Sequence, residues 1–556
     1  MTTGLSAAGL TLPSGRLGAR APQHIDRWSV LTTALAAALV GLGLGLGWRG
    51  VDLPAQLYRV AVARAHGITL WDSQWYGGHW TLNYSVLFPV TAAFVGVGVL
   101  SVLCAAASAL AFDRLVVGQL GRYARLGSAV FAVSVIVETS IGQLTFFFGE
   151  ALALWCLVAA TRRHWWLASA AAAASSLVSP LAGAFAGLAL FVWWLSLSDW
   201  SAPRMSLRGA PLRVLGVAVA GFLPIAATSV LFPGQGTMPY PLTDWVWEMG
   251  VALILWTITP YAQRVLRVGI VVYAIAATLC VLIPSPVGGN IGRLEDCLAL
   301  PLAAVACWDR DPAGRPFNRF GRLAQRLLQP RAALAVVAIP LALSQWAPAW
   351  PAITTDPGRP STHKAYYTPL LRWLDHAPGP LARVEVVPTA DHWEAAYVAP
   401  TIPLARGWER QLDIADNPIF YTPGALNAQT YLSWLRDNGV RYVALSDAPL
   451  DYAGVTEAHL VEAGVPGLDA IWHNNDWKVY QVVGSSGIVS GPARLTDMEG
   501  GTMTLDVARP GPILVRVRWN ANWQVSNGDG TIIEAPGGWM TVVATHPGVV
   551  HLDISF

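Results

Sequence analysis

The sequence predicts an α-helical bundle that crosses a membrane many times, followed by a large region outside the membrane. Hydrophobic residues make up 54% of the chain and charged residues only 13%, about half the charged fraction of a soluble domain. The hydrophobic residues form long runs before residue 348 and become sparser after it. Arginine residues gather in every second link between these runs. We therefore expect a membrane bundle over residues 29–348.

The hydrophobic runs predict about eleven membrane-spanning helices, because one span needs roughly 20 apolar residues. The third to sixth runs are short or closely spaced, so this number holds to within one or two. The expected spans are 29–48, 86–112, 126–141, 145–161, 164–179, 183–199, 213–232, 245–260, 268–284, 294–308 and 332–348.

The distribution of arginine predicts the orientation of the bundle. The loaded links carry Arg114, Arg122 and Arg125; Arg162 and Arg163; Arg204, Arg208 and Arg213; Arg264 and Arg267; and Arg310, Arg315, Arg319, Arg322, Arg326 and Arg331. The short links between them carry none. Because arginine favours the cytoplasmic side, we expect a cytoplasmic tail at residues 1–28. The first outer loop, residues 49–85, and everything after residue 349 are then outside the plasma membrane.

Composition also limits the partners and the environment. The net charge is +2 and no basic patch interleaves with aromatic residues, so a nucleic-acid partner is not expected. The chain is rich in alanine, glycine and arginine and its lysines are Lys364 and Lys478, a usage typical of a GC-rich bacterial genome. The cysteines all lie in or beside the apolar runs, where they pack as small hydrophobic residues: Cys104, Cys156, Cys280, Cys297 and Cys307.

The region outside the membrane divides into two expected domains. Residues 349–489 alternate helical and strand-like segments, as where a helix ending before Gly439 leads into a strand at residues 440–445. Residues 490–556 change to strict alternation of apolar and polar residues, separated by turn residues. These patterns predict an α/β domain and then a small β-sandwich. Trp519, Trp523 and Trp539 of the sandwich are expected either in its core or facing an acceptor sugar.

The first outer loop, residues 49–85, has a distinct pattern. Residues 53–66 predict an amphipathic helix with Pro54 at its start, lying in the plane of the membrane surface. An aromatic and glycine-rich stretch follows, made of Trp71, Asp72, Trp75, Tyr76, Gly77, Gly78, His79 and Trp80. Such aromatic residues form a membrane-surface belt or a platform for a sugar ring.

Carboxylates near the ends of the spans are the candidates for chemistry, because charges are costly inside the membrane. Asp52 and Asp72 of the first outer loop are placed where a lipid-linked phosphate and a water-soluble acceptor meet. The alternative for Asp52 is a helix N-cap, and for Asp72 a turn residue. Arg293 is either a phosphate clamp or the ion-pair partner of Glu295. The other carboxylates near outer links are Glu138, Glu150, Asp244, Glu248 and Asp296.

Three motifs of the first outer loop carry a resemblance to known families. They are Asp52-Leu53-Pro54-Ala55-Gln56-Leu57-Tyr58-Arg59, Trp71-Asp72-Ser73-Gln74-Trp75-Tyr76-Gly77-Gly78-His79, and Asn83-Tyr84-Ser85 with Pro89. They resemble the first-loop signature of the YfhO-type and pyruvoyl-tetrahydropterin-synthase-related membrane proteins. Those families are similar to the GT-C superfamily of polyprenyl-phosphate-sugar glycosyltransferases, which includes actinobacterial arabinofuranosyl- and mannosyltransferases. Residues 407–411 and 434–443 extend the resemblance.

This resemblance implies a GT-C-like bundle and a glycosyltransferase of the cell envelope. The donor would be a polyprenyl-phosphate-linked sugar, and the acceptor a cell-wall glycan or a glycolipid. An acid in the first outer loop is essential in GT-C enzymes, and this role carries onto Asp52 first and Asp72 second. The chain lacks the adjacent acid pair of some members, so the choice between the two stays open.

The same resemblance implies a set of substrate-binding residues: Gln56, Trp75, Tyr76, His79, Tyr84, Arg293 and Glu295. A phosphate leaving group needs a cation, supplied by Arg293 or by a bound divalent metal ion. No metal-ligand set is identified from the sequence. No nucleotide site is needed, which fits a sequence with neither a P-loop nor a Rossmann fingerprint.

Two other functions remain open from the sequence. A lipid or glycan transporter predicts internal repeats and interrupted helices with charges near the membrane midplane, whereas the acids here lie near span ends and no convincing repeat is found. A non-catalytic membrane scaffold that binds glycans fits the same residues. A glycosyltransferase needs a lipid-side groove and an aqueous cavity that converge on Asp52, whereas a scaffold does not.

Overall fold

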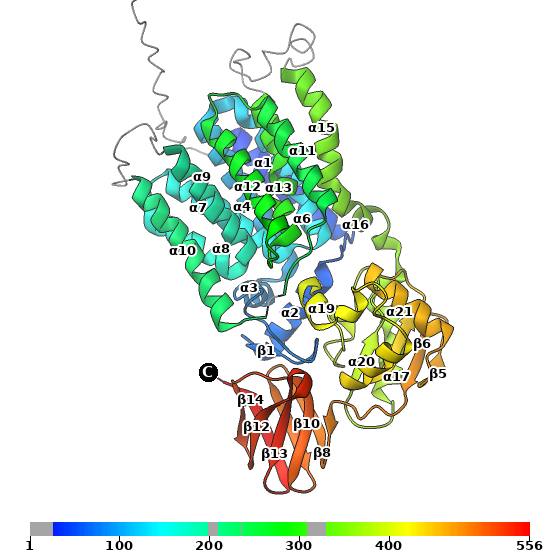
Figure 1. Ribbon diagram of the computed structural model, residues 1–556. Helices are drawn as coiled ribbons and strands as arrows, with labels where there is room; N and C mark the ends of the chain where they lie inside the picture. Colours follow the sequence, from blue (N-terminus) through cyan, green and yellow to red (C-terminus); the bar gives the residue numbers. More distant parts are fainter. Residues whose placement is uncertain (1–25, 198–209, 235, 308–329, 556) are drawn as a thin grey trace, which may run out of the picture.

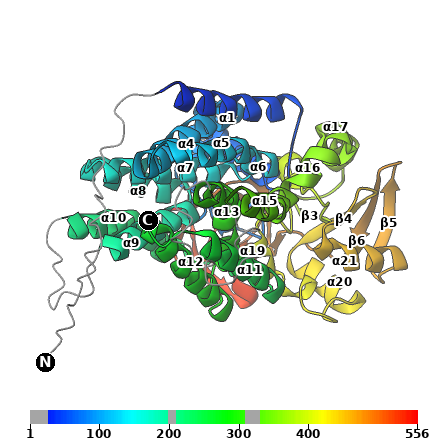
Figure 2. The ribbon, with the colours of Figure 1, turned by 90° about the horizontal axis from the view of Figure 1, so that it is seen from above.

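The computed structural model describes residues 26–197, 210–234, 236–307 and 330–555. It contains a helical bundle, an α/β domain and a β-sandwich, and the two smaller domains lie at one end of the bundle (Figure 1). We call that end the outer face. The fold class expected from the sequence is confirmed in this arrangement. Seen from above, the α/β domain projects to one side of the bundle beyond α6 and α15 (Figure 2).

Each of the eleven expected spans coincides with one helix or with a pair of helices. Gly96, with a φ of +92°, divides the second span into two helices, and the third is divided at Val135. By length and apolar composition, seven helices among the described residues can cross a membrane, so the number eleven stays a prediction. The bundle helices are α1 (Arg27–Gly45), α3 (Phe88–Val95), α4 (Val97–Leu120), α5 (Arg125–Ser134), α6 (Ile136–Ile141), α7 (Leu144–Thr161), α8 (Trp165–Val178), α9 (Pro180–Leu197), α10 (Ala210–Leu231), α11 (Leu242–Ile258), α12 (Arg264–Leu282), α13 (Arg293–Cys307) and α15 (Pro330–Trp346).

Small residues let the bundle helices approach closely. A Cβ on Gly127 of α5 would lie 2.2 Å from a methyl of Val305 in α13, and one on Gly183 of α9 would lie 2.0 Å from the Ser176 hydroxyl in α8. In a membrane, where lipid chains are as apolar as the side chains, such close packing is a main source of helix association. These glycines therefore set the helix spacing.

The α/β domain is a four-stranded sheet with helices on both faces. The strand order is β3 (Arg383–Val386), β4 (Val440–Ser446), β6 (Trp477–Val482) and β5 (Leu468–His473), and β3 and β4 are parallel. Helices α20 (Ala428–Asp437) and α21 (Tyr452–Ala463) pack on one face, and α17 (Lys364–Asp375) packs on the other. The expected helix-to-strand turn is present, with Gly439 at a φ of +66°.

The C-terminal sandwich has two antiparallel sheets with the orders β12-β13-β10-β7 and β11-β14-β9-β8. Alternate side chains of its strands, such as those of Ile513 and Val515, are fully buried between the sheets. The strands are β7 (Val489–Ser490), β8 (Ala493–Glu499), β9 (Thr502–Val507), β10 (Gly511–Arg518), β11 (Trp523–Asn527), β12 (Gly530–Ala535), β13 (Trp539–Ala544) and β14 (Gly548–Ile554).

The first outer loop is shared between the two outer domains. It holds helix α2 (Leu53–His66) and a short hairpin of β1 (Trp71–Asp72) and β2 (His79–Trp80). Tyr58 and Trp75 belong to the core of the α/β domain, whereas Trp71 and Trp80 belong to the core of the sandwich. The first outer loop therefore joins the bundle to both the α/β domain and the sandwich through their hydrophobic cores.

Helix α2 packs against the α/β domain over much of its length, and its position in the membrane surface stays a prediction. Most residues of its first two turns are buried. Arg59 is only 7% exposed, and its guanidinium pairs with Glu409 at 2.6 Å. Exposed side chains in this helix are those of Ala61 and of residues 64–66 at its C-terminal end. The helix bounds match the sequence pattern, but a partner 350 positions away decides its burial.

The orientation of the outer face is a prediction with a direct test. If it is extracytoplasmic, a reporter that is active only in the cytoplasm should be inactive when fused after residue 556, because the arginine-rich links hold the opposite side inside. The same reporter placed in the link between α13 and α15 should be active. Activity at the C-terminus and none in that link would reverse the topology.

Candidate active site at the outer face of the bundle

The backbone on either side of Asp52 is fixed by the α6–α7 link. The amide of Asp52 donates to the carbonyl of Ile141 at 3.0 Å. Cβ atoms added to Gly50 and Gly142 would each lie 2.3 Å from backbone atoms of the opposing segment. Gly142 also has a φ of +91°, a conformation that costs other residues energy. The start of α2 is therefore seated directly on the bundle.

Asp52 faces Arg293 at this position. Its carboxylate lies 3.6 Å from a guanidinium nitrogen of Arg293, and both side chains are about one quarter exposed. Asp52 occupies the N-cap position of α2, but its side chain makes no capping hydrogen bond. The N-cap alternative is therefore not realised. The carboxylate is held by one ion pair and keeps access to solvent.

Three glycines bring Arg293 to this position. Cβ atoms added to Gly288 and Gly289 would lie 1.9 and 2.8 Å from carbonyl oxygens of the α10–α11 link, and one on Gly292 would lie 2.6 Å from the carboxylate of Glu248. Arg293 is the first residue of α13, and its guanidinium carbon is 5.7 Å from the centre of the Phe146 ring. The positive end of the helix dipole thus adds to the charge of the arginine.

Carboxylates outnumber cations around Arg293. Glu138 lies within electrostatic range of both Asp52 and Arg293 and accepts from the Cys297 thiol at 3.1 Å. Glu248 accepts from the hydroxyls of Tyr240 and Tyr273. Glu295 is buried, and one of its carboxylate oxygens has no partner among the described residues. The ion pair of Arg293 is thus with Asp52 and not with Glu295.

The carboxylates near Arg293 do not form a ready metal site. Within the described residues, no group of three or more histidine, cysteine, aspartate or glutamate side chains is arranged to hold a metal ion. A divalent ion at this site stays a prediction from the sequence, and we derive no step through one. The positive charge available in this geometry is that of Arg293.

Gln56 and Tyr84 lie next to this pair but are engaged with the protein. The amide of Gln56 donates to the Tyr84 hydroxyl at 2.7 Å and accepts from the hydroxyl of Thr145 in α7. The ring of Tyr84 lies 3.8 Å from the guanidinium carbon of Arg59. Burial raises the pKa of Tyr84, and Arg59 opposes this shift while Asp52 adds to it. The polar groups of these two side chains are thus engaged within the protein.

Asp72, Trp75 and His79 of the first outer loop are buried by packing rather than presented as free binding groups. Asp72 is 1% exposed and accepts a 2.7 Å hydrogen bond from Tyr58, more than one helical turn from Asp52. Trp75 is fully buried between the rings of Tyr58, at 4.3 Å, and His79, at 5.8 Å.

The remaining aromatic candidates are also packing residues. The hydroxyl of Tyr76 accepts from the amide of Glu409 at 2.9 Å and donates to its carbonyl at 3.2 Å. Trp523 meets Trp71 edge to face, and Trp539 covers Gly77, where a Cβ would lie 2.7 Å from its ring. Of the three sandwich tryptophans, Trp519 alone is substantially exposed, at 36%. The packing alternative thus holds for Trp523 and Trp539.

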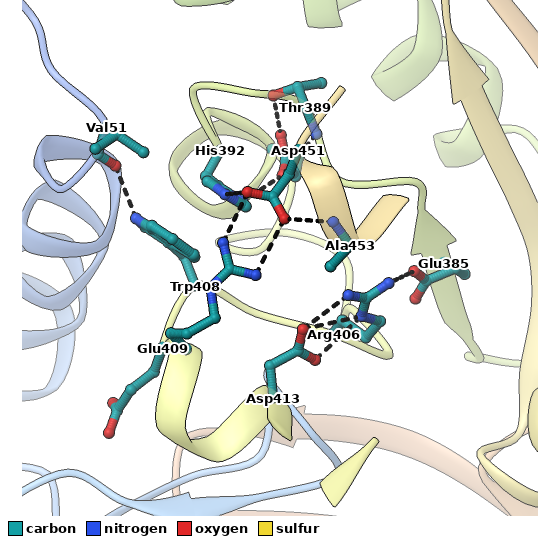
Figure 3. A network of polar contacts seen from close by, with 12 residues as sticks. Val51, Glu385, Thr389, His392, Arg406, Trp408, Glu409, Asp413, Asp451 and Ala453 are labelled. Atoms are coloured by element: carbon teal, nitrogen blue, oxygen red, sulfur yellow. Dashed lines mark hydrogen bonds and ion pairs between the residues drawn. The ribbon is translucent and has the colours of Figure 1, made fainter. Parts of the chain in front are cut away.

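Sequence reasoning missed a polar network in the α/β domain that faces the first outer loop (Figure 3). His392 is 3% exposed, and its two ring nitrogens lie 3.4 Å from Glu394 and 3.3 Å from Asp451. Asp451 also accepts a bidentate pair from Arg410. The ring of Trp408 stacks on His392 at 3.5 Å. No spacing signal links these residues, although Trp408 and Arg410 lie in the 407–411 motif.

Comparison with solved structures finds three with a similar chain fold. No family model and no curated protein sequence matches the chain. Arabinofuranosyltransferase AftD from Mycobacteria is 17% identical with a TM-score of 0.46, over 88% of this chain and 41% of its own. A mutant structure of AftD is 14% identical with the same TM-score, over 96% and 60%. This chain thus spans about two fifths to three fifths of AftD.

A third similar structure is archaeal oligosaccharyltransferase AglB from Archaeoglobus fulgidus, in complex with an inhibitory peptide and a dolichol-phosphate. It is 14% identical with a TM-score of 0.40, over 76% of this chain and 69% of its own. At identities of 14–17% and TM-scores of 0.40–0.46, these similarities assign no activity to this chain. The function has to be derived from the chain's own residues.

The network at His392 predicts a pH-dependent stability. Burial alone would lower the pKa of His392, but the hydrogen bonds and charges of Asp451 and Glu394 outweigh it and raise the pKa above the ordinary 6.5. Asp391 and Arg410 are the other charged groups nearby. Stabilisation by the protonated ring is therefore full below pH 6.5 and is lost as the pH rises through the raised pKa.

Melting temperatures of the full chain and its His392→Asn variant in detergent test this expectation. The variant should melt roughly 2–4 °C lower at acidic pH, and the gap should narrow at alkaline pH. His376→Asn, in the same domain but with a side chain 82% exposed, is the control and should show no gap. A gap of constant size across the pH range would contradict the charged state of His392.

Proposed function

We propose that this protein is an integral membrane glycosyltransferase that moves a sugar from a polyprenyl-phosphate donor to a glycan or glycolipid acceptor. The pair of Asp52 and Arg293 at the outer face carries the proposal. A partly exposed carboxylate next to a cation at a helix N-terminus suits a reaction in which a hydroxyl attacks and a phosphate leaves. The lipid chain of the donor would remain in the membrane while its phosphate reaches the outer face.

Asp52 would act as the general base. An acceptor hydroxyl is a poor nucleophile, so a carboxylate within hydrogen-bond reach takes its proton as the new bond forms. The hydroxyl oxygen bonds to the anomeric carbon of the donor sugar while the bond from that carbon to the phosphate oxygen breaks. The polyprenyl phosphate departs with the bonding electron pair.

Arg293 would stabilise the departing phosphate. Its planar guanidinium matches a phosphate in two parallel hydrogen bonds, and the N-terminus of α13 adds a positive partial charge in the same place. In the free protein this charge is balanced by Asp52 at 3.6 Å. Donor binding would shift Arg293 toward the phosphate and release the carboxylate for the acceptor hydroxyl.

Turnover of the purified full chain with radiolabelled polyprenyl-phosphate arabinofuranose or mannose tests this function. Asp52→Asn keeps the shape but removes the base, so turnover should fall roughly 10²–10⁴-fold while donor binding survives. In the same assay, Arg293→Ala should weaken donor binding and turnover together. Near-normal turnover of Asp52→Asn would contradict the assignment and favour a non-catalytic scaffold.

Matched controls separate these effects from general damage. Asp244→Asn makes the same change at an exposed acid in the first turn of the bundle helix α11. This variant should keep full turnover. Arg64→Ala removes an exposed arginine at the end of α2 and should do the same. If the controls lose as much activity as the site variants, the losses cannot be attributed to Asp52 and Arg293.

A further inference from the structure

One peptide bond next to Asp52 is held from two sides. The unit between Val51 and Asp52 contains the carbonyl of Val51 and the amide of Asp52. The amide donates to Ile141 of the bundle at 3.0 Å, and the carbonyl accepts from the indole N–H of Trp408 at 2.7 Å (Figure 3). The bundle and the α/β domain thus each form one hydrogen bond to the same peptide unit. Because this plane leads into the Cα of Asp52, its rotation would swing the carboxylate.

The indole of Trp408 is itself held firmly. Its ring lies on the imidazole of His392 at 3.5 Å with an angle of 7° between the planes, and the guanidinium carbon of Arg410 lies 4.8 Å from its centre. His392 has a φ of +53°, a strained conformation for a side chain of this size. A strained, buried histidine fixed by two carboxylates makes a rigid support for the indole.

The residues next to Trp408 hold the segment 407–411 in place. A Cβ on Gly407 would lie 2.4 Å from the ring of Trp75, so the backbone rests directly on the first outer loop. Glu409 pairs with Arg59 of α2. A Cβ on Gly236 would lie 2.3 Å from the carbonyl of Gln411, so the α10–α11 link meets the same segment. Residues 407, 409 and 411 thus each contact the first outer loop, which carries Asp52, or the α10–α11 link, which lies against the glycines before Arg293.

We propose that Trp408 is a positioning residue that orients Asp52 through the Val51 carbonyl and so couples the α/β domain to the reaction centre. This inference rests on the proposed function, in which Asp52 is the base. The geometry of a general base decides the rate, since a misplacement of about 1 Å costs up to roughly 100-fold.

The Trp408→Phe variant of the full chain tests the inference. Phenylalanine keeps an aromatic ring on His392 but loses the N–H that reaches Val51. Turnover at saturating donor should fall roughly tenfold, and the KM for the donor should not change because Arg293 is untouched. Trp477→Phe is the matched control, since it also removes a buried indole N–H bond to a backbone carbonyl, that of Tyr366 at 3.0 Å. Its kcat should stay normal at a comparable melting temperature.

A double variant distinguishes positioning from general damage. If Trp408 acts through Asp52, Trp408→Phe should cause no further loss in the Asp52→Asn background. The same tenfold loss in both backgrounds, or equal loss in Trp408→Phe and Trp477→Phe, would overturn the inference. If Trp408→Phe has a normal kcat and Asp52→Asn is inactive, the inference on Trp408 is overturned and the proposed function stands. If Asp52→Asn is active, the proposed function itself is overturned.

Discussion

The ion pair between Arg59 and Glu409 joins helix α2 to the α/β domain, and the geometry at Asp52 depends on this contact. The two side chains are 7% and 8% exposed and 2.6 Å apart. Losing one partner of such a buried pair costs roughly 3–5 kcal/mol, because the other charge is left without compensation. The outer domain therefore cannot leave the first outer loop without a large cost, and the start of α2 is held against the bundle on its other side by Gly50 and Gly142.

The aromatic and glycine-rich stretch also holds the first outer loop against the α/β domain and the sandwich. Trp75 lies in the core of the α/β domain and Trp71 in the core of the sandwich, so neither domain has a complete core without this stretch. Gly77 and Gly407 are needed where tryptophan rings lie against the backbone. Residues that look like a sugar platform in the sequence thus connect the outer domains to the first outer loop. The ion pair of Asp52 and Arg293 lies where this loop meets the bundle.

Much of the fold follows from local patterns in the sequence. The bounds of α2, the helix ending before Gly439 and the alternating strands of the sandwich depend on periodicity and turn residues, which act over a few positions. The roles of Asp72, Trp75 and His79 could not be predicted this way, because burial depends on which distant surface covers a side chain. The same limit hides Trp408 and Glu409, whose partners Val51 and Arg59 lie 357 and 350 positions away. The sequence predicts that Asp52 and Arg293 face one cavity at the outer mouth of the bundle. Their direct pairing depends on the glycines that bring the two outer links together, which no local pattern reveals.

The central claim is that Asp52 and Arg293 form one reaction centre at the outer face. A cryo-EM structure of the Asp52→Asn protein with a bound polyprenyl-phosphate sugar tests it most directly, because the slowed variant holds the donor in place. The account predicts a phosphate oxygen about 3 Å from the guanidinium of Arg293, with the anomeric carbon facing the side chain at position 52. A donor phosphate bound elsewhere, with position 52 turned away from the sugar, would contradict it.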